Sequence, residues 1–168
     1  MTSYVSIEAD DKFGFDLQEV TDLVVREVLN MEKCPYEASV NLLFTNAEEV
    51  RKLNAEYRKI DNTTDVLSFP GLHFPAPGDF SDAEQHELDC FDPDSGELLL
   101  GDIIINSEKV REQADLFNHS LKREYAFLVA HSMLHLCGYD HMKKEEAEVM
   151  EAKQEKVLQN LHITREEE

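Results

Sequence analysis

The chain has 168 residues, 42% of them hydrophobic, and carries a formal net charge of −20 with a pI near 4.6. This length favours a single domain over residues 1–168, with a core that needs no disulfide or metal to hold it together. The acidity argues against non-specific binding to nucleic acid. The lack of an apolar run of about 18 residues argues against a membrane-spanning helix.

The three cysteines, Cys34, Cys90 and Cys137, are odd in number and widely spaced. This pattern argues against a disulfide framework and is typical of a reducing compartment. The first residues, Met-Thr-Ser-Tyr-Val-Ser-Ile-Glu, lack the basic and apolar regions of a secretory signal. We therefore expect a cytoplasmic protein without a membrane anchor, and we expect Cys137 to be a core thiol.

The first part of the chain alternates predicted strands and helices. Three segments of alternating β-formers predict strands, at residues 4–9, 38–44 and 65–69. Asp16 can cap a helix that runs to about Met31. Asn46, with Glu49 three residues later, resembles a capping box for a helix that ends near Arg58.

The middle of the chain contains a long acidic segment and then a strongly apolar one. Residues 71–97 are rich in Pro, Gly and acidic residues, and no Lys or Arg occurs between His73 and Glu97. We expect an exposed, mobile loop here, with room for a hairpin. Residues 98–105 are apolar apart from Gly101-Asp102, which predicts a central strand buried on both faces.

Three helices are expected in the remainder: from Asn106 or Ser107 to about Phe117, from Ser120 through His135, and over about 143–160. The order strand, helix, strand, helix, strand, strand and then helices predicts an α+β fold. A small mixed β-sheet is packed with helices, and the histidine-bearing helix lies on one of its faces.

The most informative stretch is His-Ser-Met-Leu-His-Leu-Cys-Gly-Tyr-Asp-His, from His131 to His141. Imidazoles four residues apart, at His131 and His135, share one face of a helix. Gly138 can end the helix and return the chain, so that His141 supplies a third nitrogen. Three neutral imidazoles suit Zn²⁺ and leave a fourth position open for water, as in catalytic sites. The HxxxHxxGxxH spacing therefore predicts a zincin-like metal site.

The same spacing occurs in the metzincin peptidases, which need Glu directly after the first histidine as general base. This chain has Ser132 there, and a serine hydroxyl is too weak a base for that task. A zinc peptidase remains an alternative, but another use of the metal is favoured. We expect Ser132 to pack or to bond the backbone.

Other candidates favour structural interpretations. Turn hydrogen bonds are favoured for Asp65, Ser68 and Asp102, although Asp65 and Ser68 flank a strand that should line the cleft. Asp140 is adjacent to His141 and is a candidate general base, but a hydrogen bond that supports the site or its turn is favoured. Surface positions are expected for the histidines outside the motif: His73, His86, His119 and His162. Two interpretations are equally favoured for the basic clusters: contacts with RNA phosphates, or ordinary solvated helix faces. One cluster is Arg51, Lys52, Arg58 and Lys59, and the other is Lys109, Arg111, Lys122 and Arg123.

Four segments together resemble the YbeY-type endoribonucleases, a family of rRNA maturation factors. They are Leu53-Asn54-Ala55-Glu56-Tyr57-Arg58, Thr64-Asp65-Val66-Leu67-Ser68-Phe69-Pro70, Leu100-Gly101-Asp102-Ile103-Ile104-Ile105, and His131 to His141. They lie in the family's order. The combination separates this family from the peptidases, which the histidine motif alone does not.

The resemblance implies one zinc ion held by His131, His135 and His141, with His131 and Arg58 serving catalysis or RNA binding. It implies cleavage of single-stranded RNA, in 16S rRNA 3′-end maturation and ribosome quality control. The implied partners are ribosomal RNA and the ribosome or its small-subunit proteins. A non-catalytic ribosome assembly factor with a structural metal remains a second alternative.

Overall fold

The computed structural model describes residues 1–9 and 13–163, and within these ranges four strands form one sheet. The strands are β1 (Thr2–Ile7), β2 (Ala38–Thr45), β3 (Val66–Pro70) and β4 (Leu98–Asn106). Their order across the sheet is β1-β2-β4-β3. β1, β2 and β4 are parallel, whereas β3 pairs with β4 in the antiparallel sense. The sheet is therefore mixed, as predicted, and β3 is an edge strand.

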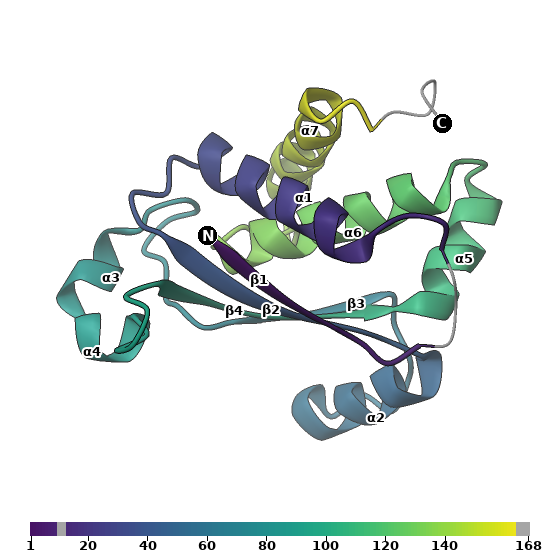
Figure 1. The fold of residues 1–168 in the computed structure, drawn as a ribbon, viewed down its shortest axis with the longest axis horizontal. Coiled ribbons are helices and arrows are strands. Elements are labelled where there is room, and N and C mark those ends of the chain that lie inside the picture. Colours follow the sequence, from purple (N-terminus) through teal and green to yellow (C-terminus); the bar gives the residue numbers. More distant parts are fainter. Residues whose placement is uncertain (10–12, 164–168) are drawn as a thin grey trace.

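The described residues also form seven helices: α1 (Leu17–Met31), α2 (Ala47–Arg58), α3 (Ser81–Gln85), α4 (Glu87–Cys90), α5 (Ser107–Leu116), α6 (Leu121–Leu136) and α7 (Lys144–Asn160). Helices α1 and α6 cover one face of the sheet and α7 packs beyond them, whereas α2 lies on the opposite side (Figure 1). In residues 1–9 and 13–163, no helix combines the length and apolarity needed to cross a bilayer.

The helices begin where side-chain caps are available. The side chains of Asp16, Asn46, Asn106 and Ser120 each accept a hydrogen bond from a backbone N–H in the first turn of α1, α2, α5 and α6. These bonds satisfy amides that have no partner within the helix. The predicted caps are therefore confirmed, and Asn106 rather than Ser107 caps α5.

Helix α6 is the centre of the core. It packs against α1, α5, α7 and the sheet, so most of its circumference is buried. Alternate residues of β2 and β4 face it, including Leu42, Phe44 and Ile103, which are at most 2% exposed. Tyr125 of α6 is fully buried, and its hydroxyl lies 2.7 Å from that of Thr21 in α1, which satisfies both groups. A helix packed over most of its circumference is a rigid base for a functional site.

The prediction that β4 is buried on both faces is wrong at two positions. Leu99 is 39% exposed, and Asp102 is also exposed. Helix α2 covers only the part of this face where Val50, Leu67 and Ile104 form a small cluster. The rest of this face stays open in residues 1–9 and 13–163, where α2 is the helix that packs on it.

A bulge at Gly101 sets the phase of β4. Val40 of β2 pairs with Gly101 although Ser39 pairs with Leu99, so β4 contains one extra residue. The bulge lets Leu100 and Ile103 both point into the core. At Gly101, φ is +139°, and a Cβ there would lie 2.2 Å from the carbonyl oxygen of Phe69.

The prediction of an exposed loop over residues 71–97 needs correction, because the segment contains two short helices and a few buried residues, although most of its described positions are at least partly exposed. It contains α3 and α4, Phe80 and Ala83 belong to the core, and Phe91 forms an antiparallel bridge with Leu98. Phe74 packs edge-to-face on Phe80, with ring centroids 5.3 Å apart. The few apolar residues of this acidic segment attach it to the rest of the molecule.

Replacing Gly101 with Ala should destabilise the protein by roughly 3 kcal/mol, because the new Cβ collides with backbone that cannot move away. Gly96→Ala is the matched control: its φ of +74° also strains an L-residue, but no atom lies within 4 Å of the added Cβ. That variant should lose only about 1–2 kcal/mol. Urea unfolding of metal-free protein measures both, and equal losses would show that the close approach at Gly101 costs nothing.

Candidate metal centre

The last two turns of α6 and the loop after it bring three histidines together. His131 and His135 lie on α6, which ends at Leu136. Gly138 has φ +96°, and its N–H donates to the carbonyl of His135 at 3.0 Å, which turns the chain back. His141 then reaches the first two rings, with centroid distances of 5.4 Å to His131 and 5.1 Å to His135.

The geometry of the three rings fits one metal ion. One nitrogen from each ring lies within 4.8 Å of the other two, and the Nε2 atoms of His131 and His135 are 3.1 Å apart. Two nitrogen ligands of a tetrahedral zinc ion are about 3.3 Å apart. His131 and His135 are partly buried and His141 is exposed, so the cluster faces solvent on one side.

The orientation of His135 is fixed by the loop itself. Its Nδ1 lies 2.9 Å from the carbonyl oxygen of Tyr139. A carbonyl can only accept, so Nδ1 carries the hydrogen and Nε2 keeps a free lone pair. A backbone atom three positions after the end of α6 therefore sets the tautomer of the second ligand.

Tyr139 is in turn tied to two distant helices. Its hydroxyl donates to Glu32, the C-cap residue of α1, whose side chain is only 3% exposed. Lys153 of α7 donates to the other carboxylate oxygen of Glu32 at 2.9 Å. The buried carboxylate thus links α1, α7 and the loop that delivers His141. Glu32 was not predicted from the sequence, because it lies 107 residues from Tyr139 and belongs to no motif.

Segment 71–97 also supports this loop. The backbone N–H of Gly78 donates to the carbonyl of Cys137 at 2.8 Å. A Cβ at Gly138 would lie 2.7 Å from Cβ of Phe74. Gly138 is therefore required both by its positive φ and by the close approach of Phe74.

Burial keeps the imidazoles in the form that binds metal. Burial, with help from the neighbouring His135, lowers the pKa of His131 to about 4. Burial also lowers the pKa of His135. Cys137, two residues after His135, is fully buried, and this burial raises the pKa of its thiol. It is a core thiol, as predicted.

Two serines near the site bond each other. The hydroxyl of Ser68 in β3 donates to that of Ser132 at 2.8 Å, and Ser132 is fully buried. The prediction that Ser132 packs is confirmed. The hydrogen-bond partner of its hydroxyl is a side chain of the neighbouring strand. Ser68 likewise bonds across to α6 rather than forming a turn at the end of its strand.

Two of the three aspartates make the kind of hydrogen bond that was predicted, and the third does not. Asp140 accepts from the N–H of His141 at 2.7 Å, which stabilises the loop, and Asp65 accepts from the N–H of Val66 at 2.8 Å, at the start of β3. Asp102 accepts instead from the side chain of Asn41 at 3.0 Å across the sheet. The predicted turn role of Asp102 is wrong, because the bulge at Gly101 keeps it within the strand.

Two further surface predictions need correction. The side chain of His119 is 6% exposed and its Nε2 lies 2.6 Å from Oε2 of Glu124, so it is buried because α6 supplies a carboxylate partner. Arg123 is 6% exposed and donates to Glu155 and to the carbonyl of Ile163. Its guanidinium is already paired within the protein, so Arg123 is not available to bind an RNA phosphate. His73, His86 and His162 are exposed, as predicted.

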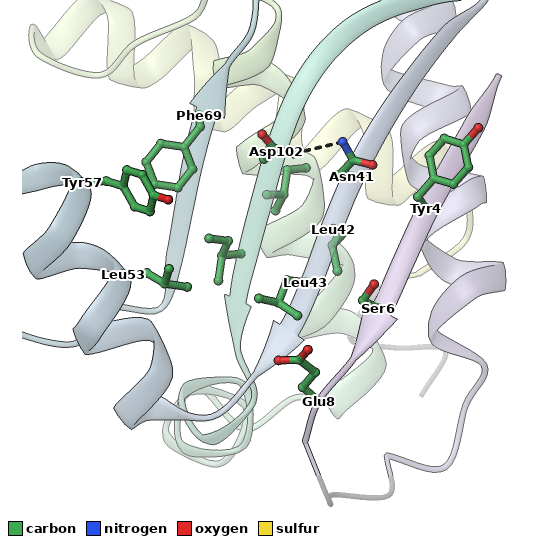
Figure 2. A pocket seen from close by; sticks show the side chains of 12 residues that line it. Tyr4, Ser6, Glu8, Asn41, Leu42, Leu43, Leu53, Tyr57, Phe69 and Asp102 are labelled. Carbon is green, nitrogen blue, oxygen red and sulfur yellow. Dashed lines mark hydrogen bonds between the residues drawn. The ribbon is translucent and has the colours of Figure 1, made fainter. Parts of the chain in front are cut away.

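Arg58 lies on the other side of the sheet edge from the histidines. It is the exposed last residue of α2, and the preceding Tyr57 packs on Phe69 of β3 with centroids 5.5 Å apart. Figure 2 shows this aromatic pair at one end of a groove of about 570 Å³ on the open face of the sheet, with Tyr4 toward its other side. A smaller cavity of about 180 Å³ lies beside the metal centre and is lined by His131, His141 and residues of α7.

The stability of the metal-free protein should fall on acidification because of His131. A histidine whose pKa drops from 6.5 to about 4 on folding binds its proton more readily when unfolded. The neutral ring therefore contributes fully to the free energy of unfolding above pH 6.5, and this contribution is lost as the pH falls toward 4. Urea midpoints between pH 7 and 4 should fall more steeply for wild type than for His131→Gln, which cannot titrate. Parallel curves would contradict this assignment.

Comparisons with known proteins agree with the resemblance in the motifs. The sequence model described as Endoribonuclease YbeY matches residues 5–162. The chain is 51% identical to Endoribonuclease YbeY of Lachnoclostridium phytofermentans and 53% identical to that of Lachnospira eligens, in each case over 98% of this chain and 100% of the relative. The solution structure of TM1509 from Thermotoga maritima is similar, with a TM-score of 0.54, 27% identity, and coverage of 94% of this chain and 91% of that one. This chain therefore belongs to the YbeY endoribonuclease family.

Proposed function

We propose that this chain is a single-domain, zinc-dependent endoribonuclease that cleaves single-stranded RNA in the cytoplasm, in 16S rRNA 3′-end maturation and ribosome quality control. The observation that carries the proposal is the cluster of His131, His135 and His141, whose nitrogens converge with one side open to solvent. Family membership supports RNA as the substrate, because the curated relatives are endoribonucleases.

His131, His135 and His141 would hold the zinc ion, since all three donors are imidazole nitrogens and the lowered pKa values of the first two keep them neutral. A zinc ion held there supplies Lewis acidity, which can polarise a phosphoryl oxygen or lower the pKa of a water molecule toward 7. The fold contributes fixed ligand positions, because α6 is packed over most of its circumference and the loop is tied to Glu32.

Arg58 is the residue we propose to meet the negative charge that develops on the phosphate, with His131 as the catalytic ligand at the metal. Adjacent residues of β3 contact the elements that carry the two groups: Ser68 bonds Ser132 of α6, and Phe69 packs on Tyr57 of α2. An RNA strand crossing this sheet edge would pass both. The guanidinium can donate two parallel hydrogen bonds to phosphate oxygens.

The strong acidity bears on the partner. With a net charge of −20, the chain gains little from general attraction to RNA. We therefore propose that small-subunit ribosomal proteins, which present basic surfaces, help to bring it to its substrate. The zinc peptidase alternative is disfavoured, because Ser132 is buried and bonded to Ser68 where such a peptidase needs an exposed carboxylate.

Cleavage of a single-stranded 16S-derived RNA tests the proposal with purified wild type, His135→Ala and Arg58→Ala. We expect His135→Ala to lose both zinc and activity. Arg58→Ala should keep its zinc and lose about 10²–10³-fold in rate, the usual effect of removing one donor to transition-state charge. Treatment with a chelator should abolish wild-type activity, and added zinc should restore it.

Lys156→Ala removes one exposed positive charge on α7 and is the control for net charge. It should cut RNA as wild type does. If folded His135→Ala and Arg58→Ala both cut at the wild-type rate, the activity lies elsewhere and the proposal fails. If wild type binds zinc but never cuts RNA, while His135→Ala fails to fold, the chain is the non-catalytic assembly factor with a structural metal.

A further inference from the structure

Helix α7 contains a glutamine where an apolar residue would be expected. Met150, Val157 and Leu158 form the buried face of the helix, and Gln154 lies on the same face with only 2% exposure. Burying an amide costs free energy unless its polar atoms find partners. A polar side chain retained at this position therefore needs a specific contact to offset its burial.

The polar partner of the Gln154 side chain is the imidazole of His131. Gln154 and His131 line the same cavity between α6 and α7, close enough for the amide to hydrogen-bond the imidazole. His131 turns its Nε2 toward Nε2 of His135, at 3.1 Å. The nitrogen left for a partner outside the cluster is therefore Nδ1. An amide can serve either tautomer, because it offers an oxygen acceptor and an NH₂ donor on the same carbon.

We propose that Gln154 is a positioning residue of the metal centre, whose amide oxygen accepts the Nδ1–H of His131 and so directs the Nε2 lone pair toward the ion. This inference rests on the proposed zinc site. The arrangement parallels that at His135, whose Nδ1 is held by the carbonyl of Tyr139. Hydrogen bonds of this kind orient metal-bound imidazoles and raise their basicity.

Lys153, the residue before Gln154 on α7, also contacts the surroundings of the histidine cluster. Lys153 bonds Glu32, which also accepts from Tyr139 of the metal loop. Two consecutive residues of α7 thus support the site by different routes: Gln154 through His131, and Lys153 through the loop that carries His141. The position of α7 on α6 thereby fixes two of the three ligands.

The test compares zinc affinity in three variants by competition with a chromophoric chelator, without RNA. Gln154→Leu keeps the side-chain volume but removes the acceptor, and it should weaken zinc binding about 10- to 100-fold. Gln154→Glu keeps an acceptor at the same distance and should bind zinc at least as tightly as wild type. Gln159→Leu, at an exposed position of the same helix, should bind zinc as wild type does.

A second measurement does not depend on any variant. In ¹⁵N spectra of zinc-loaded wild type, His131 should show a protonated Nδ1 and a metal-bound Nε2, and Gln154→Leu should shift the Nδ1 signal. Metal binding through Nδ1, or equal affinity of wild type and a folded Gln154→Leu, would overturn the inference while leaving the zinc site intact. Failure of wild type to bind zinc would overturn the proposed function as well.

Discussion

The metal centre depends on how helix α6 ends. His131 and His135 lie on the helix, whereas His141 follows a turn that must reverse the chain within a few residues. Gly138 makes this possible because its φ of +96° is unfavourable for residues with a Cβ, and because Phe74 occupies the space where a Cβ would be. Any change that lets the helix continue past Leu136 would carry His141 away from the other two rings.

The supporting contacts form a second layer around this turn. The carbonyl of Tyr139 orients His135, the carboxylate of Glu32 anchors Tyr139, and the backbone of Gly78 bonds Cys137. Apart from the loop itself, these contacts come from α1 and from the acidic segment 71–97, and Lys153 of α7 adds a further bond to Glu32. Segment 71–97 has a structural role, because its apolar residues Phe74 and Phe80 pack against the rest of the molecule, Phe74 next to Gly138. Such a layer fixes the positions of the imidazoles, two of which are partly buried.

The elements of the fold were largely predictable because their signals are local. A capping residue such as Asp16 or Asn106 can be recognised from the few residues around it. The same holds for the alternation of apolar residues over 38–44, which predicts a strand. The three histidines were predictable for the same reason, since they lie within eleven residues of sequence.

The predictions that were wrong concern residues whose environment depends on other elements of the fold. The burial of His119 needs Glu124 and the packing of α5 on α6, and the exposure of Leu99 follows from the limited reach of α2. Glu32 and Gln154 carry no local signal of a role at the site, because each acts through a residue on another element.

The central claim is that His131, His135 and His141 hold one zinc ion and leave a position for water or substrate. X-ray absorption at the zinc edge, on protein loaded with one equivalent, measures this directly. The account predicts three imidazole nitrogens and one further light atom at roughly 2.0–2.1 Å, with no sulfur. A sulfur at about 2.3 Å, which would place a cysteine in the site, or a set of four protein ligands, would contradict it.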